Sequence, residues 1–468
     1  MHLNRFMSAL SVLFVLAAGV ARAETIRVAI GTQDTTINCA TGGVLIRELK
    51  LLERYLPHDG KYKDVNYQIE WKNFTSGAPL TSEMVAGKLD IGSMADFPGA
   101  LNGATFQKAG RKSVFINVLS GSTIGSGNGI VVPKASSVQS LADLKGKTIS
   151  VPFASTAHGL LLRAVKAQGW DPEKDITIVT QAPEIAGPAL QANKIDAHAD
   201  FVPFAELFPY RGYARKIYDG SQADAATFHG TLADAEYARK YPEIVVAFER
   251  AAIEADRLFA AEPEKYSELV AKNTGIDAEV IYLFHGPQGL QTRDLSWKPE
   301  YRQALKTAIE TLRLLKRVDS DLDVNAFIDD RYVRTAFQQA SLNYEAQLKN
   351  YAKQPFAEKA AKDARTGKAI EDTRRAAQIW VQGEARVRNY ASPESAFLDL
   401  SGLEQSGKKI RVIYGTDRSN GLKLFASDGW YVVNGKEINA FLLKEVAEAW
   451  VRQHGGKLVD YAAARAAV

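Results

Sequence analysis

In the stretch "VPFASTAHGLLLRAV" at residues 151–165, the sequence changes from a strand pattern to a helix pattern, and this change indicates the fold. Before it, "GKTISVPF" (146–153) has the alternating pattern of a strand. After it, "HGLLLRAV" (158–165) carries apolar residues at helical spacing. A strand that leads directly into a helix is typical of parallel sheets covered by helices.

The same alternation continues on both sides of this stretch. Strand patterns lie at 25–31, 67–74, 88–95, 113–120 and 128–134, with helical patterns at 45–56 and from Thr81. This order predicts an α/β fold with parallel sheets. From about Asp234 onward the chain reads as nearly all helix, in runs at 236–259, 261–272, 299–317 and 332–352.

Two further segments follow the helical region. Residues 353–378 are rich in Ala and Lys and poor in large apolar residues, so we expect a linker, either a solvated helix or a loose tether. Residues 379–468 again mix strand and helix patterns, which predicts a small C-terminal α+β domain. Earlier in the chain, "GSTIGSGNG" (121–129) is dense in glycine but lacks the Gly-Lys-Ser/Thr end of a phosphate loop. We therefore interpret residues 121–129 as a flexible segment that crosses between two lobes.

Composition narrows the class of protein. A chain of 468 residues is expected to hold two or three domains, and its net charge of +4 is not massed in one block. No concentrated basic face points to nucleic acid. Cys39 is the sole cysteine, which excludes an internal disulfide and a cysteine-rich metal site. The small residue Cys39 is therefore expected to be packed rather than reactive.

The first 23 residues have the pattern of a signal peptide. Arg5 precedes an apolar run from Ala9 to Val20, and Ala21-Arg22-Ala23 matches the small-x-small pattern of a cleavage site. An apolar run of about a dozen residues is too short for a membrane span, which needs about 20. We therefore expect export to the periplasm, with cleavage after Ala23 and a mature chain that starts near Glu24.

Ser155 and His158 lie three positions apart at the start of the expected helix. A nucleophilic pair would need a third, orienting group and a tight strained turn, and no Gly-x-Ser-x-Gly occurs here. The alternative is that Ser155 and Thr156 cap the helix, whose free N–H groups then form an anion site. Capping alone and capping with ligand binding remain equally open on the local sequence.

"IDAHADFVPF" (195–204) places Asp196, His198 and Asp200 on one face of a strand. Carboxylates and an imidazole suit zinc, copper or iron. Such polar residues at a strand end more often border a cleft without metal, so metal binding is kept only as the alternative.

Together these stretches resemble a known family. "FTSGAPLTSEMVAGKLDIGSMADFPGAL", "GIVVPKASSVQSLADLKGKTISVPFASTAHGLLLRAV" and "ALQANKIDAHADFVPFAEL" are similar to the periplasmic substrate-binding proteins of ABC importers for nitrate, alkanesulfonates, taurine and thiamine precursors. The resemblance implies a two-lobed type II periplasmic binding protein over residues 24–352, with the second lobe at about 125–215. It also implies capture of a small organic anion or zwitterion and a membrane ABC permease as partner.

The resemblance also implies which residues contact the ligand. These are the loop after the first strand, the segment at "SG", the "DFP" turn and the helix start at "STAH". In this chain they are Gln33, Asp34, Ser76, Gly77, Asp96, Phe97, Ser155, Thr156, Ala157 and His158. Many relatives have an Asp directly before a Pro where this chain has Val202-Pro203, and Asp200, two positions earlier, joins the expected ligand residues.

The C-terminal domain resembles a different family. "RVIYGTDRSNGLKLFASDGWYVV" and "INAFLLKEVAEAWVRQHGGKLVDY" are similar to the accessory copper lipoproteins associated with nitrous-oxide reductase, but the Met-Gly pair and the lipid-anchored Cys of that family are missing. We therefore expect a domain for docking or stability, and a metal-linked, copper-binding periplasmic accessory or sensor protein remains the alternative function. The main expectation is a monomeric binding protein that is not an enzyme and has no cofactor.

Overall fold

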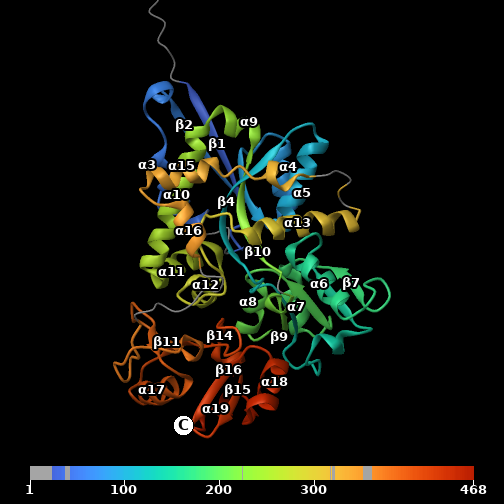
Figure 1. Ribbon diagram of the computed structural model, residues 1–468, viewed down its shortest axis with the longest axis vertical. Coiled ribbons are helices and arrows are strands. Elements are labelled where there is room, and N and C mark those ends of the chain that lie inside the picture. The colour runs from blue at the N-terminus through green and yellow to red at the C-terminus, as the bar shows by residue number, and fades with distance from the viewer. Residues whose placement is uncertain (1–23, 37–42, 224, 317, 319–321, 352–360) are drawn as a thin grey trace, which may run out of the picture.

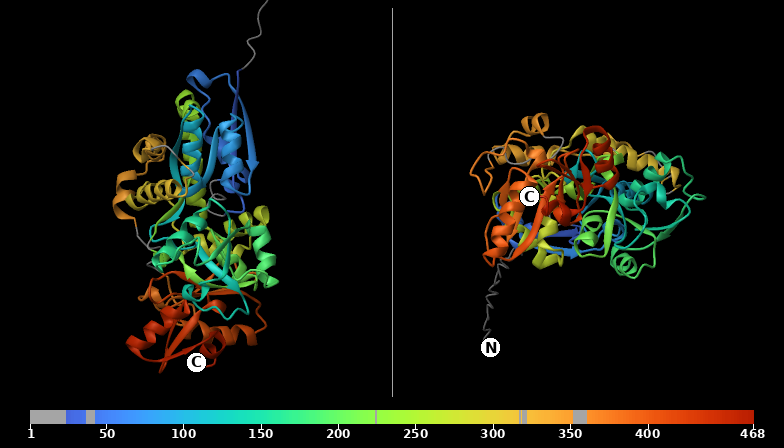
Figure 2. Two further views of the ribbon diagram at one scale, coloured as in Figure 1. Left: turned by 90° about the vertical axis from the view of Figure 1, so that its right-hand side faces the viewer. Right: turned by 90° about the horizontal axis from the view of Figure 1, so that it is seen from below.

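The computed structural model describes residues 24–36, 43–223, 225–316, 318, 322–351 and 361–468. The expected signal peptide, residues 1–23, and Cys39 lie outside these ranges. Figures 1 and 2 show two α/β lobes, a set of helices beside them and a C-terminal domain at the far end of the molecule from lobe 1. The expected fold class, a two-lobed α/β protein with a small C-terminal α+β domain, is confirmed.

Lobe 1 is built on a five-stranded sheet with the order β2-β1-β3-β10-β4. Its strands are β1 (Thr25–Thr32), β2 (Asn66–Asn73), β3 (Ile91–Ala95), β4 (Ser113–Ser122) and β10 (Thr227–Asp234), and its helices are α2 (Val44–Glu48), α3 (Leu51–Tyr55), α4 (Gly77–Val85) and α5 (Asp96–Lys108). All five residues of β3 are buried, including the polar Ser93. This strand lies inside the sheet between β1 and β10, and a strand that is buried on both faces does not alternate between exposed and buried positions.

Lobe 2 repeats the arrangement with the order β7-β6-β8-β5-β9. Its strands are β5 (Gly129–Pro133), β6 (Thr148–Val151), β7 (Thr177–Thr180), β8 (Ala197–Asp200) and β9 (Ala214–Asp219), and its helices are α6 (Thr156–Ala167), α7 (Pro183–Gln191) and α8 (Phe204–Tyr210).

One strand in each sheet departs from the expected parallel arrangement. β10 runs antiparallel to β3 and β4, and β5 runs antiparallel to β8 and β9. Each of them is the strand with which the chain enters that lobe from the other one. The strand therefore starts at the edge where its neighbours end.

The segment between β4 and β5 crosses between the lobes. Its backbone takes positive φ at Gly125 (+88°) and Gly127 (+98°), a region that favours glycine. An added Cβ on Gly125 would lie 2.2 Å from the carbonyl oxygen of Ala225 in the returning segment. Ser126 Oγ donates to Leu290 O at 2.6 Å, so the crossing is buried and anchored to a third part of the chain.

After the second crossing the chain is helical, as the apolar spacing predicts. The helices are α9 (Ala235–Lys240), α10 (Pro242–Ala261), α11 (Pro263–Thr274), α12 (Ala278–His285), α13 (Pro299–Leu314), α14 (Val324–Phe327), α15 (Arg331–Gln339) and α16 (Tyr344–Asn350). Proline at the first position of α10, α11 and α13 suits a site whose N–H has no helical acceptor. α10 packs on α3, and α11 packs on α2 and α10, which attaches these helices to lobe 1. Across the described ranges, no helix combines the length and apolarity needed to cross a membrane.

The C-terminal domain contains two small sheets, with the orders β12-β11-β13-β14 and β16-β15-β17. Its elements are β11 (Ala377–Val381), β12 (Arg388–Tyr390), α17 (Pro393–Gln405), β13 (Ile410–Thr416), β14 (Lys423–Phe425), β15 (Trp430–Asn434), β16 (Glu437–Phe441), α18 (Lys444–His454), β17 (Lys457–Val459) and α19 (Tyr461–Arg465).

Part of the expected linker 353–378 is folded into this domain. Residues 361–378 form neither one solvated helix nor a loose tether, because the buried Asp363 accepts hydrogen bonds from the backbone of Arg365, Thr366 and Ala391. A short 3₁₀ helix, Thr373–Arg375, follows, and β11 begins at Ala377. Short-range capping by one aspartate thus orders a segment that has few large apolar side chains.

The C-terminal domain contacts both lobe 2 and the α11–α12 pair. On the lobe 2 side, the rings of Phe425 and Tyr210 are in contact, with centroids 4.8 Å apart and planes tilted by 33°. On the other side, Arg411 pairs with Glu279 at 2.7 Å, and Tyr414 donates to the carbonyl oxygen of Glu279 at 2.8 Å. The domain therefore bridges lobe 2 and the α11–α12 pair, which itself contacts α2 of lobe 1 and α8 of lobe 2.

Candidate ligand site

A cavity of about 240 Å³ lies between the two lobes, and we call it the cleft cavity. Segments that follow strands β1, β2 and β3 line it from lobe 1, and segments that follow β6, β7 and β8 line it from lobe 2. This is the edge at which ligands bind in open α/β sheets. Its polar lining residues are Gln33, Thr36, Thr75, Ser76, Thr81, Ser155, Thr156, Thr180, Glu184 and His229.

Three helices begin at the cleft cavity. The first residues of α4, α6 and α7 all belong to its lining or follow it directly. The N–H groups at the start of a helix have no acceptor within the helix, and the helix dipole makes this end partly positive. Among the described lining residues, none is a lysine or an arginine. The cavity is therefore suited to an anion that is held by amides and hydroxyls.

The start of α6 is shaped by its own sequence. Ser155 has an extended backbone and caps the helix, because its Oγ accepts a hydrogen bond from the N–H of His158 at 3.2 Å. Just before it, Ala154 takes a positive φ of 56°, which turns the chain from β6 into the helix. The N–H groups of Thr156 and Ala157, at the first two helical positions, are left without an acceptor inside α6.

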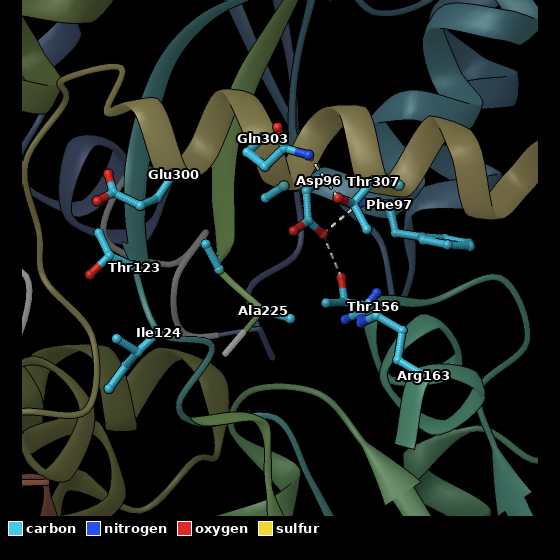
Figure 3. A pocket seen from close by; sticks show the side chains of 13 residues that line it. Asp96, Phe97, Thr123, Ile124, Thr156, Arg163, Ala225, Glu300, Gln303 and Thr307 are labelled. Atoms are coloured by element: carbon cyan, nitrogen blue, oxygen red, sulfur yellow. Dashed lines mark hydrogen bonds between the residues drawn. The ribbon is translucent and has the colours of Figure 1, made fainter. Parts of the chain in front are cut away.

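Asp96 and Thr156 join the two lobes. Thr156 Oγ1 donates to Asp96 Oδ1 at 3.0 Å, and the same oxygen accepts from the N–H of Phe97 at 2.6 Å (Figure 3). Burial raises the pKa of the Asp96 carboxyl, while these hydrogen bonds and the attraction of Arg163 act in the opposite direction. Asp96 and Phe97 line a second cavity on α13, and Thr156 lines both cavities.

Eleven residues were expected at the ligand, namely the ten implied by the family resemblance and Asp200. Five of them line the cleft cavity. They are Gln33, Ser76, Gly77, Ser155 and Thr156. Gln33 is oriented by a hydrogen bond from its Nε2 to the carbonyl oxygen of Ser93 at 3.0 Å. Gly77 is required by close packing, because an added Cβ would lie 2.5 Å from Pro98 Cβ.

Three other residues that were expected at the ligand, Asp34, Ala157 and His158, make contacts outside the cavity. Asp34 is buried and bound by both terminal nitrogens of Arg47 at 3.1 Å and by the hydroxyl of Thr32. Ala157 is fully buried in the core of lobe 2. His158 turns its ring toward Phe153, with 5.2 Å between ring centroids, and its Nδ1 accepts from the N–H of Ala154. These three side chains support the cavity wall and are absent from its lining.

The alternation of Asp196, His198 and Asp200 does not produce a metal site. His198 and Asp200 are 0% exposed, and His198 Nε2 lies 2.8 Å from Asp200 Oδ2 while its Nδ1 lies 2.7 Å from Ser150 Oγ. Asp196 precedes the strand and accepts from the N–H of Thr148 at the surface. Within the described part of the chain, no group of three His, Cys, Asp or Glu residues is placed to hold a metal ion. Asp200 is likewise not in the cavity lining.

Several lining residues were not predicted from the sequence. Phe201 lines the cleft cavity directly after Asp200, and Phe153 lines it beside the start of α6. His229, on the returning strand β10, reaches the same cavity from more than 70 positions further along the chain than Phe153. Complete burial lowers the pKa of His229 to about 3, so its imidazole is neutral in the folded protein.

The chain is similar in sequence to known binding proteins. The family described as NMT1/THI5 like matches residues 117–266. A protein of Escherichia coli (strain K12) named as an aliphatic sulfonates-binding protein is 30% identical over 281 residues, which are 59% of this chain and 81% of the relative. The taurine-binding periplasmic protein of the same organism is 31% identical over 206 residues, 43% of this chain and 61% of the relative.

The structural comparison covers the two lobes. The crystal structure of the periplasmic aliphatic sulphonate binding protein SsuA from Escherichia coli is 27% identical, with a TM-score of 0.53, and covers 67% of this chain and 99% of that one. The resemblance of residues 379–468 to copper lipoproteins finds no support in these relatives and stays a prediction. The relative that is 30% identical over 81% of its own length, together with the shared two-lobed architecture, shows that this chain belongs to the family of the aliphatic sulfonates-binding proteins, and its residues 117–266 match the NMT1/THI5-like model.

Proposed function

We propose that this protein is an extracytoplasmic solute-binding protein that captures a small organic anion or zwitterion of the sulfonate type for an ABC importer. One observation carries the proposal. Three helix N-termini meet at a cavity between the lobes, and the described lining offers amides and hydroxyls without a lysine or arginine. A singly charged oxyanion is stabilised in such a site by the helix ends and by hydrogen bonds. The names of the relatives support the same class of ligand.

In this proposal the two halves of the ligand have different surroundings. The N–H groups of Thr156 and Ala157, together with the hydroxyls of Ser76 and Ser155, hold the anionic head. Gln33 adds an amide from lobe 1. The carbon chain lies against apolar lining residues, which are Pro98, Leu101, Phe153 and Phe201. Asp96 acts as a positioning residue that holds Thr156, and Glu184, at the first turn of α7, is available to a cationic group of a zwitterion.

The cellular setting belongs to the same proposal. We infer a periplasmic protein whose signal peptide is cleaved after Ala23 and which delivers its ligand to a membrane permease as a monomer. The function needs no cofactor, no nucleic acid and no covalent chemistry, because binding alone shifts the balance between open and closed lobes. The periplasmic location of the relatives supports this setting.

Titration calorimetry on the full mature protein tests the proposal, with ethanesulfonate, taurine and nitrate as ligands. The cleft cavity is blocked by Ser76→Trp, a change at an exposed position that makes no side-chain capping bond. Ser82→Trp is the matched control, because Ser82 is exposed on the same helix and is absent from the lining. We expect binding of a sulfonate by the wild type and by Ser82→Trp, and at least a tenfold loss in Ser76→Trp. Equal affinity in all three proteins would place the ligand elsewhere.

A further inference from the structure

The second cavity has a volume of about 440 Å³ and is not used by the proposed function. Its walls come from α5, α6, α13 and the two crossing segments (Figure 3). Thr156, which donates to Asp96, lines both this cavity and the cleft cavity. The volume is in the range of sites for small molecules, which are about 300–1,000 Å³. Its lining mixes apolar side chains with polar and charged ones, which are Asp96, Thr123, Thr156, Arg163, Glu300, Gln303 and Thr307.

Arg163 is the positive group of this cavity. It lies on α6, and its Nε is buried without a hydrogen-bond partner among the described residues. Asp96 attracts it through space, but the hydrogen bonds of Asp96 are made with Thr156 and with the N–H of Phe97. Burial lowers the pKa of the guanidinium, since a desolvated charge is costly without a partner. A planar anion that accepted from Arg163 would relieve this cost.

Glu300 supplies a negative group on the other side of the cavity. It lies in the first turn of α13, and its Oε2 accepts from the hydroxyl of Tyr351 at 2.5 Å. Figure 3 shows Arg163 and Glu300 on opposite sides of the hollow. Between them on α13, Gln303 Nε2 lies 3.4 Å from Thr307 Oγ1, and both side chains face the space. Arg163 and the neighbouring Asp96 thus lie at one side of the cavity and Glu300 at the other, with the hydrogen-bonding groups of Gln303 and Thr307 also in the lining.

We propose that the second cavity is a separate binding site for an amino carboxylate, whose carboxylate binds Arg163 and whose ammonium group binds Glu300. A carboxylate fits the fork of a guanidinium through two parallel hydrogen bonds, which a tetrahedral sulfonate head matches less well. The ammonium group pairs with the carboxylate of Glu300. The site joins lobe 2, through α6, to α13, which packs on α5 of lobe 1. A ligand here therefore contacts both lobes without entering the cleft cavity.

Calorimetry with the full mature protein tests this site. The probes are glycine, β-alanine and γ-aminobutyrate, which separate the two charges by increasing lengths. Propionate lacks the ammonium group and propylamine lacks the carboxylate, so each controls for one charge. We expect one of the amino carboxylates to bind with a stoichiometry of one, in the presence and in the absence of saturating ethanesulfonate. Failure of all three to bind at 10 mM would overturn the proposal.

Variants then assign the binding to the cavity. Arg163→Met should weaken the amino carboxylate at least tenfold, and Lys166→Met, an exposed change on the same helix, should leave it unchanged. Glu300→Gln should weaken the amino carboxylate but not a simple carboxylate. If Arg163→Met proves unfolded by circular dichroism, Arg163→Lys, which keeps the charge and loses the fork, replaces it and should still reduce affinity.

The outcome is distinguishable from that of the proposed function. Ser76→Trp should remove sulfonate binding and retain amino carboxylate binding. Loss of both ligands in Ser76→Trp would show that the cleft cavity is the common site and would overturn the second one. Loss of sulfonate binding in Arg163→Met alone would instead refute the placement of the sulfonate in the cleft cavity.

Discussion

Replacing Glu249 by Gln should stabilise the protein, by an amount that grows with pH. Glu249 lies on α10 with its side chain fully buried, and its Oε2 accepts from Asn117 Nδ2 at 2.9 Å. Burial raises the pKa of this carboxyl to about 8 from the usual value of 4.5. The folded protein therefore keeps a proton on Glu249 that the unfolded chain releases above about pH 4.5.

The sign and size of the effect follow from this difference. Between pH 4.5 and 8 the folded state binds the extra proton, so the free energy of unfolding falls as the pH rises. Each pH unit contributes about 1.4 kcal/mol, which makes the loss at pH 7 about 3 kcal/mol. Gln keeps the shape and the acceptor for Asn117 but does not titrate, so Glu249→Gln removes the loss.

Urea unfolding of both proteins from pH 4.5 to 8 measures the difference. The two curves should meet near pH 4.5 and separate by about 3 kcal/mol at pH 7. Glu53→Gln, at an exposed glutamate on α3, is the control and should follow the wild type throughout. A constant offset between wild type and Glu249→Gln, or a gain that is largest at low pH, would falsify the reasoning.

Three further changes test other parts of the structure. His229→Gln should reduce the fall in the free energy of unfolding at acid pH. The pKa of His229 is lowered to about 3, so its imidazole stays neutral in the folded state while it is protonated in the unfolded chain, and the wild type loses about 2 kcal/mol between pH 6.5 and pH 5. An unchanged acid transition in the variant would contradict this. Ser155→Ala should cost about 1 kcal/mol in urea unfolding because the α6 cap is lost, and Ser155→Asp should restore it. Tyr414→Phe should cost about 1 kcal/mol and speed hydrogen exchange in α12; equal exchange rates would show that the hydroxyl does not hold the C-terminal domain.

The elements that set the fold were predictable because their signals are local. The alternation in β1 and the strand-to-helix change at Ser155 depend only on neighbouring residues, and both elements form where expected. The direction of β10 and β5 was not predictable in this way, since it depends on the side from which the chain enters each lobe. Residues 361–378 were misjudged because one buried aspartate, rather than apolar spacing, orders them.

The part of the candidate site that is formed by helix-capping residues was predictable from the sequence. The role of a side chain was not predictable where a residue distant in the sequence binds it. Ser155 and Thr156 follow from the start of α6 alone. Asp34 was expected at the ligand, but its partner Arg47 lies 13 positions away and takes its carboxylate. Asp200 is likewise held by His198, whose other nitrogen meets Ser150, 48 positions earlier. No local pattern reveals such pairs.

The C-terminal domain has a consequence for how the receptor would move. Its ring contact with Tyr210 lies on lobe 2, whereas its bonds to Glu279 lie on α12, next to the α11 that packs on lobe 1. A rotation of lobe 2 relative to α12 would have to slide or break one of these two contact sets. The free energy needed to change these contacts would oppose that movement. The affinity for the solute would then depend also on a domain that does not touch the solute.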